Sequence, residues 1–215
     1  MKIFLVLLIL IFGIQSLAKA DNIRDLEIEG ISVGDSLLDF YSVDEINNNI
    51  DPNIYKNKDG KFKLVGFYDG DFGEYDGMQF AFKTKDKKFK IYGVNAGIFY
   101  SNIDECKTKM MSIRKEISSL FKNAGKNFDV RRAHPADKTK KSYVISNGFF
   151  LDKGSVSVKC FDWSDEITKK YGWGDNLRVG IKLKEYNDWL KWYCLFIQSF
   201  IKLQNINTDM TKKQF

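Results

Sequence analysis

The longest helical pattern in the chain, residues 102–123, most constrains what the chain can fold into. Charged residues lie mostly on one side of this pattern, and the other side carries an apolar stripe with a spacing of three or four residues: Ile103, Cys106, Met110, Ile113, Ile117 and Leu120. A stripe of this width is typical of a helix that packs one face on a core. Because one member of the stripe is a cysteine, this core helix is also a candidate for a covalent link.

Runs of alternating apolar and polar residues lie on both sides of this helix in the sequence. They predict strands over residues 61–68, 78–83, 89–98, 142–151, 155–163 and 177–183. Asp152-Lys153-Gly154 predicts a tight hairpin. Capping residues, Asp35 or Ser36 for the first and Ser42 for the second, predict two short helices. The sequence therefore predicts an α+β fold, with a mostly antiparallel sheet in two strand groups and one long helix packed across a face.

The first twenty residues predict a secretory signal peptide. Lys2 is followed by an apolar run over residues 3–14, and the segment ends in Ala18-Lys19-Ala20. The run is shorter than the roughly 20 apolar residues that span a bilayer, which disfavours a membrane anchor. We expect a periplasmic or secreted protein, with a signal peptide over residues 1–20, one domain over 21–190 and a C-terminal helical extension over 191–215.

The net charge and the lack of known motifs exclude several classes of function but do not identify one. Cleavage after Ala20 removes Lys2 and Lys19, which lowers the formal net charge from +6 to +4. The remaining charges are mixed along the chain, so we expect no nucleic-acid partner, because such a partner needs basic residues clustered on one face. No catalytic, metal-binding or cofactor motif occurs. The expected function is a non-catalytic binding or interaction module for a small ligand or an envelope protein.

Three cysteines follow the signal peptide: Cys106, Cys160 and Cys194. Cys160 shares a strand face with Val156 and Val158, and this is the face expected beneath the helix that carries Cys106. A Cys106–Cys160 bond is therefore reasonable if the two Cα atoms lie within about 7 Å. It would close a loop of roughly fifty residues and stabilise the fold by about 4 kcal/mol. Two buried, unpaired thiols are the alternative, and Cys194 has no assigned role.

The polar stretch over residues 131–141 (RRAHPADKTKK) has no periodicity and predicts a surface loop. Its basic side chains predict a site for an anion such as phosphate or sulfate: Arg131, Arg132, His134, Lys138, Lys140 and Lys141. A hydrolase that uses His134, the sole histidine, as a general base is an alternative. A solvated loop without a ligand is a third interpretation.

Three further stretches allow two interpretations each. The four carboxylates of residues 69–76 suggest calcium, but the spacing favours a plain acidic turn. Trp163, Tyr171 and Trp173 are candidates for an aromatic binding surface, although the abundance of aromatic residues favours a core role. Residues 189–203 are apolar almost all round, which predicts a buried helix or contact with a partner or a membrane surface.

Four short strings carry a resemblance: GISVGDSLL at residues 30–38, HPADK at 134–138, CFDWS at 160–164 and DNLRV at 175–179. In these strings the chain resembles small exported proteins of AT-rich marine alphaproteobacteria, a group to which no activity is assigned. The resemblance covers about residues 21–190 and implies export, a single domain and a Cys106–Cys160 pair. Residues 191–215 depart from it, and a native extension and a shifted reading frame both remain open.

Overall fold

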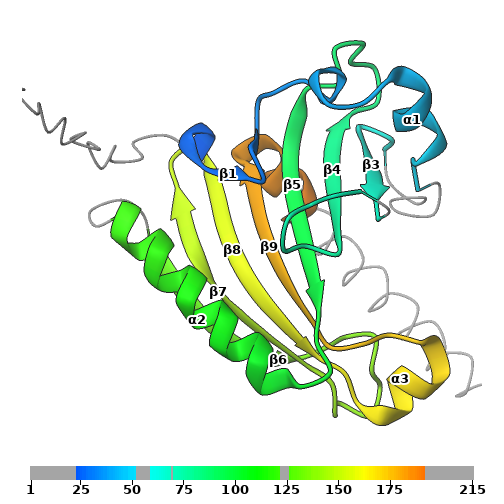
Figure 1. Ribbon diagram of the computed structural model, residues 1–215. Helices are drawn as coiled ribbons and strands as arrows, with labels where there is room; N and C mark the ends of the chain where they lie inside the picture. Colours follow the sequence, from blue (N-terminus) through cyan, green and yellow to red (C-terminus); the bar gives the residue numbers. More distant parts are fainter. Residues whose placement is uncertain (1–22, 52–58, 69, 122–125, 192–215) are drawn as a thin grey trace, which may run out of the picture.

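A seven-stranded antiparallel sheet forms the centre of the protein (Figure 1). The computed structural model describes residues 23–51, 59–68, 70–121 and 126–191. The strand order is β3-β4-β5-β9-β8-β7-β6, and the bounds are β3 Phe62–Phe67, β4 Gly77–Lys83, β5 Ile91–Phe99, β6 Lys126–Ala133, β7 Tyr143–Leu151, β8 Gly154–Asp162 and β9 Asn176–Leu183. The two predicted strand groups are joined because β9 pairs with both β5 and β8. The predicted α+β fold is confirmed.

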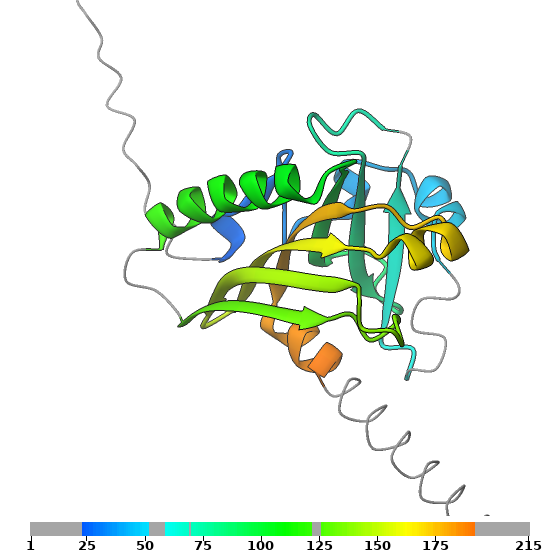
Figure 2. The ribbon, with the colours of Figure 1, turned by 90° about the horizontal axis from the view of Figure 1, so that it is seen from below.

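The predicted core helix is α2, Ile103–Leu120, which lies on one face of the sheet over β7, β8 and β9 (Figure 2). It begins after Asn102, whose side chain accepts a hydrogen bond from the Asp104 backbone N–H (2.9 Å) and so satisfies one of the free donors of the first turn. Its buried side chains, Cys106, Met110 and Ile117, belong to the predicted stripe. The stripe therefore fixes which side of α2 faces the sheet.

The N-terminal segment contributes to the same core as α2. Its elements are η1 (Ile23–Asp25), β1 (Glu27–Ile28), β2 (Ile31–Ser32), η2 (Leu37–Asp39) and α1 (Val43–Asn48). Buried aliphatic residues from these elements join the sheet residues in one cluster. The predicted capping box begins α1: Ser42 Oγ accepts the Glu45 N–H, and the Glu45 carboxylate accepts the Ser42 N–H at 2.8 Å. This face of the sheet is therefore covered by α2 and the N-terminal segment.

The described residues cover only one corner of the opposite face of the sheet. A helix over residues 184–191 lies on the side away from α2 (Figure 2). Its Tyr186 is buried against Phe62, Leu64 and Ala81 of β3 and β4. Among the described residues, no helix is long and apolar enough to cross a membrane. The predictions for Cys194 and for most of residues 189–203 lie outside the described residues.

Two local predictions are corrected. Arg131 and Arg132 lie in β6, paired with Ile145 and Val144, so the predicted loop begins only at His134. An edge strand is paired on one side only, so it tolerates the polar sequence that suggested a loop. In the strand pattern over residues 89–98 the inward face switches at Gly93, which predicts a bulge at this residue. In the structure Ala81 pairs with Gly93 and Phe82 with Ile91, so the extra residue is Tyr92.

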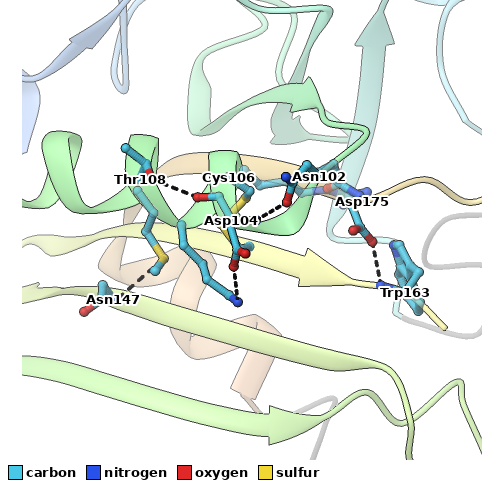
Figure 3. Close-up of a disulfide and its surroundings, with 12 residues drawn as sticks. Asn102, Asp104, Cys106, Thr108, Asn147, Trp163 and Asp175 are labelled. Carbon is cyan, nitrogen blue, oxygen red and sulfur yellow. Dashed lines mark hydrogen bonds and ion pairs between the residues drawn. A yellow bond between two sulfur atoms is a disulfide. The ribbon is translucent and has the colours of Figure 1, made fainter.

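The predicted cysteine pair joins α2 to the middle of the sheet (Figure 3). Cys106 and Cys160 form a disulfide with their Cα atoms 6.0 Å apart, inside the limit that such a bond requires. Both residues are fully buried. The alternation of β8 placed Cys160 under the helix, as predicted, and the bond therefore links the two layers covalently.

Candidate anion-binding face

The open face of the sheet has a floor of small and amide side chains. Ser157, Gly180, Asn95 and Gln79 are consecutive partners across β8, β9, β5 and β4. A Cβ atom on Gly180 would lie 2.5 Å from Oδ1 of Asn95. The Asn95 amide can therefore lie against β9 only because residue 180 is a glycine. The centre of this sheet face is therefore a depression, with space above it for a ligand.

Two adjoining pockets occupy this space. The larger, about 380 Å³, extends toward Lys159, Phe161, Lys182, Tyr186 and Leu190. The smaller, about 190 Å³, extends toward Tyr68, Asp76 and Phe99. Both pockets are lined by Gln79, Asn95 and Arg178. They therefore form one continuous groove across the strands, which we call the sheet groove.

Three cations line the larger pocket of the sheet groove: Lys159 on β8, and Arg178 and Lys182 on β9. Lys159 is the direct cross-strand partner of Arg178, an arrangement in which like charges destabilise a sheet. In the part of the chain that the structure describes, none of the three forms an ion pair with a carboxylate. Their charges are therefore uncompensated.

Electrostatics in the sheet groove oppose the charged state of the lysines. Burial, with smaller contributions from Lys159 and Arg178, lowers the pKa of Lys182 to about 7. The pKa of Lys159 is lowered by burial and then by Arg132 and Arg178. Lys159 and Lys182 are half-buried, whereas Arg178 is exposed. An anion in the groove would supply the missing opposite charge and favour the protonated lysines.

A row of aromatic side chains continues from the larger pocket, and we call it the aromatic row: Phe161, Trp163, Trp173 and Tyr171. The Arg178 guanidinium lies 4.9 Å from the centre of the Phe161 ring. Successive ring centres along the row are 6.0, 4.8 and 4.9 Å apart. Tyr171 and Trp173 are 48% and 40% exposed, so the favoured core interpretation is wrong for these two residues. Trp163 is half-buried, and its backbone N–H donates a hydrogen bond to Asp175 Oδ1 (2.7 Å; Figure 3).

His134 lies beside the aromatic row rather than in open solvent. Its ring packs edge-on against Trp163, with centres 4.4 Å apart, and its Nδ1 accepts the Ala136 N–H at 3.1 Å. Burial, followed by the charges of Arg132 and Arg178, lowers its pKa. Among the described residues, no nucleophile or carboxylate forms a hydrogen bond with the imidazole. The hydrolase hypothesis gains no support from this geometry and stays a prediction.

Asp137 organises the loop that the sequence predicted to bind an anion. Its Oδ2 accepts hydrogen bonds from the backbone N–H and hydroxyl of Ser142 (2.8 and 2.7 Å) and from Ser164 Oγ (3.2 Å). Its Oδ1 accepts from Thr139 N–H and Oγ1 (2.8 and 2.6 Å). These bonds hold the pKa of the Asp137 carboxyl well below its usual range. A carboxylate therefore lies at the centre of the predicted anion site.

The basic residues of that predicted site do not converge in the described structure. Arg131 and Arg132 are consecutive in β6 and point to opposite faces of the sheet. Arg131 stacks on Tyr143 at 3.6 Å, and Lys141 lies 3.9 Å from Glu166. Lys138, Lys140 and Lys141 are exposed. Anion binding by this loop stays a prediction, while Arg132 lies on the face of the sheet that carries Lys159.

The acidic stretch over residues 69–76 has the hydrogen bonds of a structural turn. Asp71 Oδ1 accepts the Gly73 N–H (3.3 Å), Asp76 Oδ2 accepts the Phe99 N–H (2.7 Å) and Glu74 pairs with Lys109 (2.6 Å). Asp69 lies outside the described residues. Among those described, no group of three or more side chains is placed to hold a metal ion.

Sequence reasoning missed the cations of the sheet groove. It placed Arg178 and Lys182 on the polar side of a strand, but it did not predict which strands neighbour β9. Lys159, Arg178 and Asn95 come together only through the pairings of β9 with β8 and β5. One sequence pattern could have indicated these cations: the polar faces of β8 and β9 carry Lys159, Arg178 and Lys182 but no acidic residue.

Comparison of the chain with protein-family models, with curated proteins and with solved structures gives no match. The fold and the site define an α+β protein with one sheet face covered by a core and the other open, grooved and cationic. The side chains of this face are therefore the features of the molecule that indicate a function.

Proposed function

We propose that the protein is an exported, non-catalytic binding module that holds a negatively charged small ligand in the sheet groove. The observation that supports this is the group of three cations, Lys159, Arg178 and Lys182, without a carboxylate partner in the described structure. Half-buried charges without partners cost stability. A ligand that forms charge-assisted hydrogen bonds with them would offset this cost.

The shape and chemistry of the groove favour a small ligand over an envelope protein. Pockets for small ligands are concave and combine apolar walls with a few placed polar groups. Here Leu64, Tyr186 and Leu190 supply apolar wall, while Asn95 and Ser157 supply hydrogen-bonding groups. These apolar walls and polar groups are sufficient to bind a ligand, whereas catalysis would also need a general acid, a general base or a nucleophile.

Export rests on the predicted signal peptide and gains support from the disulfide, since such bonds persist in oxidising compartments. We expect the protein recovered from its producing cells to begin at Asp21, which intact-mass measurement checks. A protein that retains residues 1–20 would contradict this part of the proposal.

Calorimetric titration of the protein with sulfate, inorganic phosphate and citrate tests the binding proposal. We expect at least one of these anions to bind, and Lys182→Met and Lys159→Met each to weaken it by about tenfold, the effect of losing one charged hydrogen bond. Lys153→Met is the matched control, because Lys153 is exposed in the turn between β7 and β8. The proposal fails if no anion binds, or if all three variants bind like the parent protein.

A further inference from the structure

The sheet groove and the aromatic row form one elongated surface. Phe161 lines the larger pocket and also begins the row, so no wall separates the two. At the smaller pocket, Tyr68 and Phe99 are 60% and 65% exposed. Soluble proteins seldom leave several large aromatic rings exposed around one groove unless the rings bind something. The surface thus combines a cationic centre with flat apolar rims.

The length of the surface exceeds what one small anion needs. The part of β9 from Asn176 to Lys182 spans about 20 Å at 3.3 Å per residue. The exposed rings of Tyr171 and Trp173 extend the surface beyond Phe161. A ligand that contacts both the cations and these rings is therefore a chain of several units.

We infer that the sheet groove and the aromatic row bind an acidic oligosaccharide, a short sugar chain that carries carboxylate or sulfate groups. This rests on the proposed function, because the cations of the groove anchor the acidic groups. The C–H face of a sugar ring packs on the negative face of an aromatic ring, such as Trp173 or Tyr171. Asn95 and Ser157 offer hydrogen bonds to sugar hydroxyls.

Single-stranded nucleic acid is the competing occupant, since it also combines stacking with cations. Its phosphates are spaced evenly along the chain, so cations would have to accompany the stacking rings. At the exposed end of the aromatic row, Lys170 lies over the Tyr171 ring, 4.9 Å from its centre. Acids lie there as well: Asp165 and Glu166 are in the first turn of α3 (Asp165–Tyr171), and Asp175 accepts the Trp163 backbone N–H. The acids would repel a chain that carries a phosphate at every unit, whereas a sugar chain can place uncharged units beside them.

The test is a titration of the protein with four probes: a tetrasaccharide of uronic acid, a neutral tetrasaccharide of matched length, inorganic sulfate and oligothymidylate. We expect the acidic tetrasaccharide to bind more tightly than the other three. Trp173→Ala should weaken it by about three- to tenfold, the range for one aromatic contact, and leave sulfate binding unchanged. Tyr171→Ala, at a more exposed ring, provides a second variant with a lower risk to folding. Phe40→Ala, which removes an exposed ring far along the sequence, is the control and should change neither affinity.

The outcomes separate the two proposals. If Lys159→Met and Lys182→Met weaken sulfate but both aromatic variants bind the tetrasaccharide like the parent, the oligosaccharide inference is overturned and the anion site stands. Equal affinity for the acidic and neutral sugars, or tighter binding of oligothymidylate, also overturns the inference. If no anionic probe binds, the proposed function and the inference fall together.

Discussion

Lys182 occupies an environment that a lysine side chain does not prefer. It is half-buried in the larger pocket, which Lys159, Arg178 and Tyr186 also line, and no carboxylate of the described residues forms an ion pair with it. Its pKa of about 7 lies below the ordinary lysine value of about 10.4, which the unfolded chain retains. The unfolded chain therefore holds the proton over a pH range in which the folded chain releases it.

This difference makes stability depend on pH. Between about pH 7 and 10.4 the unfolded state binds more protons, so the free energy of unfolding rises with pH. Below pH 7 the folded protein bears the full cost of the buried charge. We predict that Lys182→Met stabilises the protein at pH 6 by on the order of 2 kcal/mol, a figure that allows for the partial exposure of the side chain. The gain should fade as the pH approaches 10.4.

Urea unfolding at pH 6 and pH 10, in buffers free of sulfate and phosphate, measures this effect. Lys153→Met should show the same stability as the parent at both pH values. An equal difference between Lys182→Met and the parent at the two pH values would show that the Lys182 ammonium carries no burial cost.

For single residues, the sequence predicted the positions of apolar side chains well and those of charged side chains poorly. Cys106 and Cys160 were predictable, because each belongs to an apolar pattern that marks the inside of its element. Lys182 was not, because an alternating strand gives the same pattern whether its polar face meets water or lines a groove. The pocket depends on Tyr186 and Leu190 from the following helix, whose position the strand pattern does not encode.

Among the elements, α2 has a single covalent link to the sheet, the Cys106–Cys160 disulfide to β8. The bond spans a sequence separation of 54 residues that includes β6 and β7. Closing a loop of this length restricts the unfolded chain, and the chain-entropy model assigns it about 4 kcal/mol. The link therefore acts mainly on the unfolded chain and less on the packing of α2.

We predict that Cys106→Ala with Cys160→Ala lowers the free energy of unfolding by about 4 kcal/mol while keeping the fold. Urea unfolding followed by circular dichroism measures the loss. The parent protein in reducing buffer should approach the double variant, and the double variant should not respond to the reductant. A parent protein that unfolds at the same urea concentration with and without reductant would contradict the prediction.

The bounds of the helices and strands were easier to predict from the sequence than the order in which the strands pair in the sheet. The strands of β4, β5, β7, β8 and β9 and the helix α2 were predicted close to their observed bounds because each has a clean period of two or of three to four residues. The start of the loop after β6 was wrong by three residues, since Arg131 and Arg132 occupy an edge position that water reaches. The strand order was not predictable, because alternation says which face is buried but not which strand lies alongside.

For the whole molecule, the central property is the difference between the two faces of one sheet. One face is closed by α2 and residues 23–48, and it holds the main apolar cluster. The other carries glycines, amides and cations, and the described residues close it only where Tyr186 packs at the β3 and β4 corner. Stability thus comes chiefly from one side, which leaves the other side available for a ligand.

An open sheet also exposes the molecule to association along its outer strands, and the two edges differ in how they resist it. The β3 edge already has a partner: Asp51 N–H donates to Leu64 O (3.1 Å), and Gly66 N–H donates to Asn49 O (3.2 Å). The β6 edge carries exposed Asp129, Arg131 and Arg132, and charges on an edge discourage a second chain from adding a strand. Both edges of the sheet therefore disfavour strand pairing with a second copy of the protein, while the described residues leave a broad polar face uncovered.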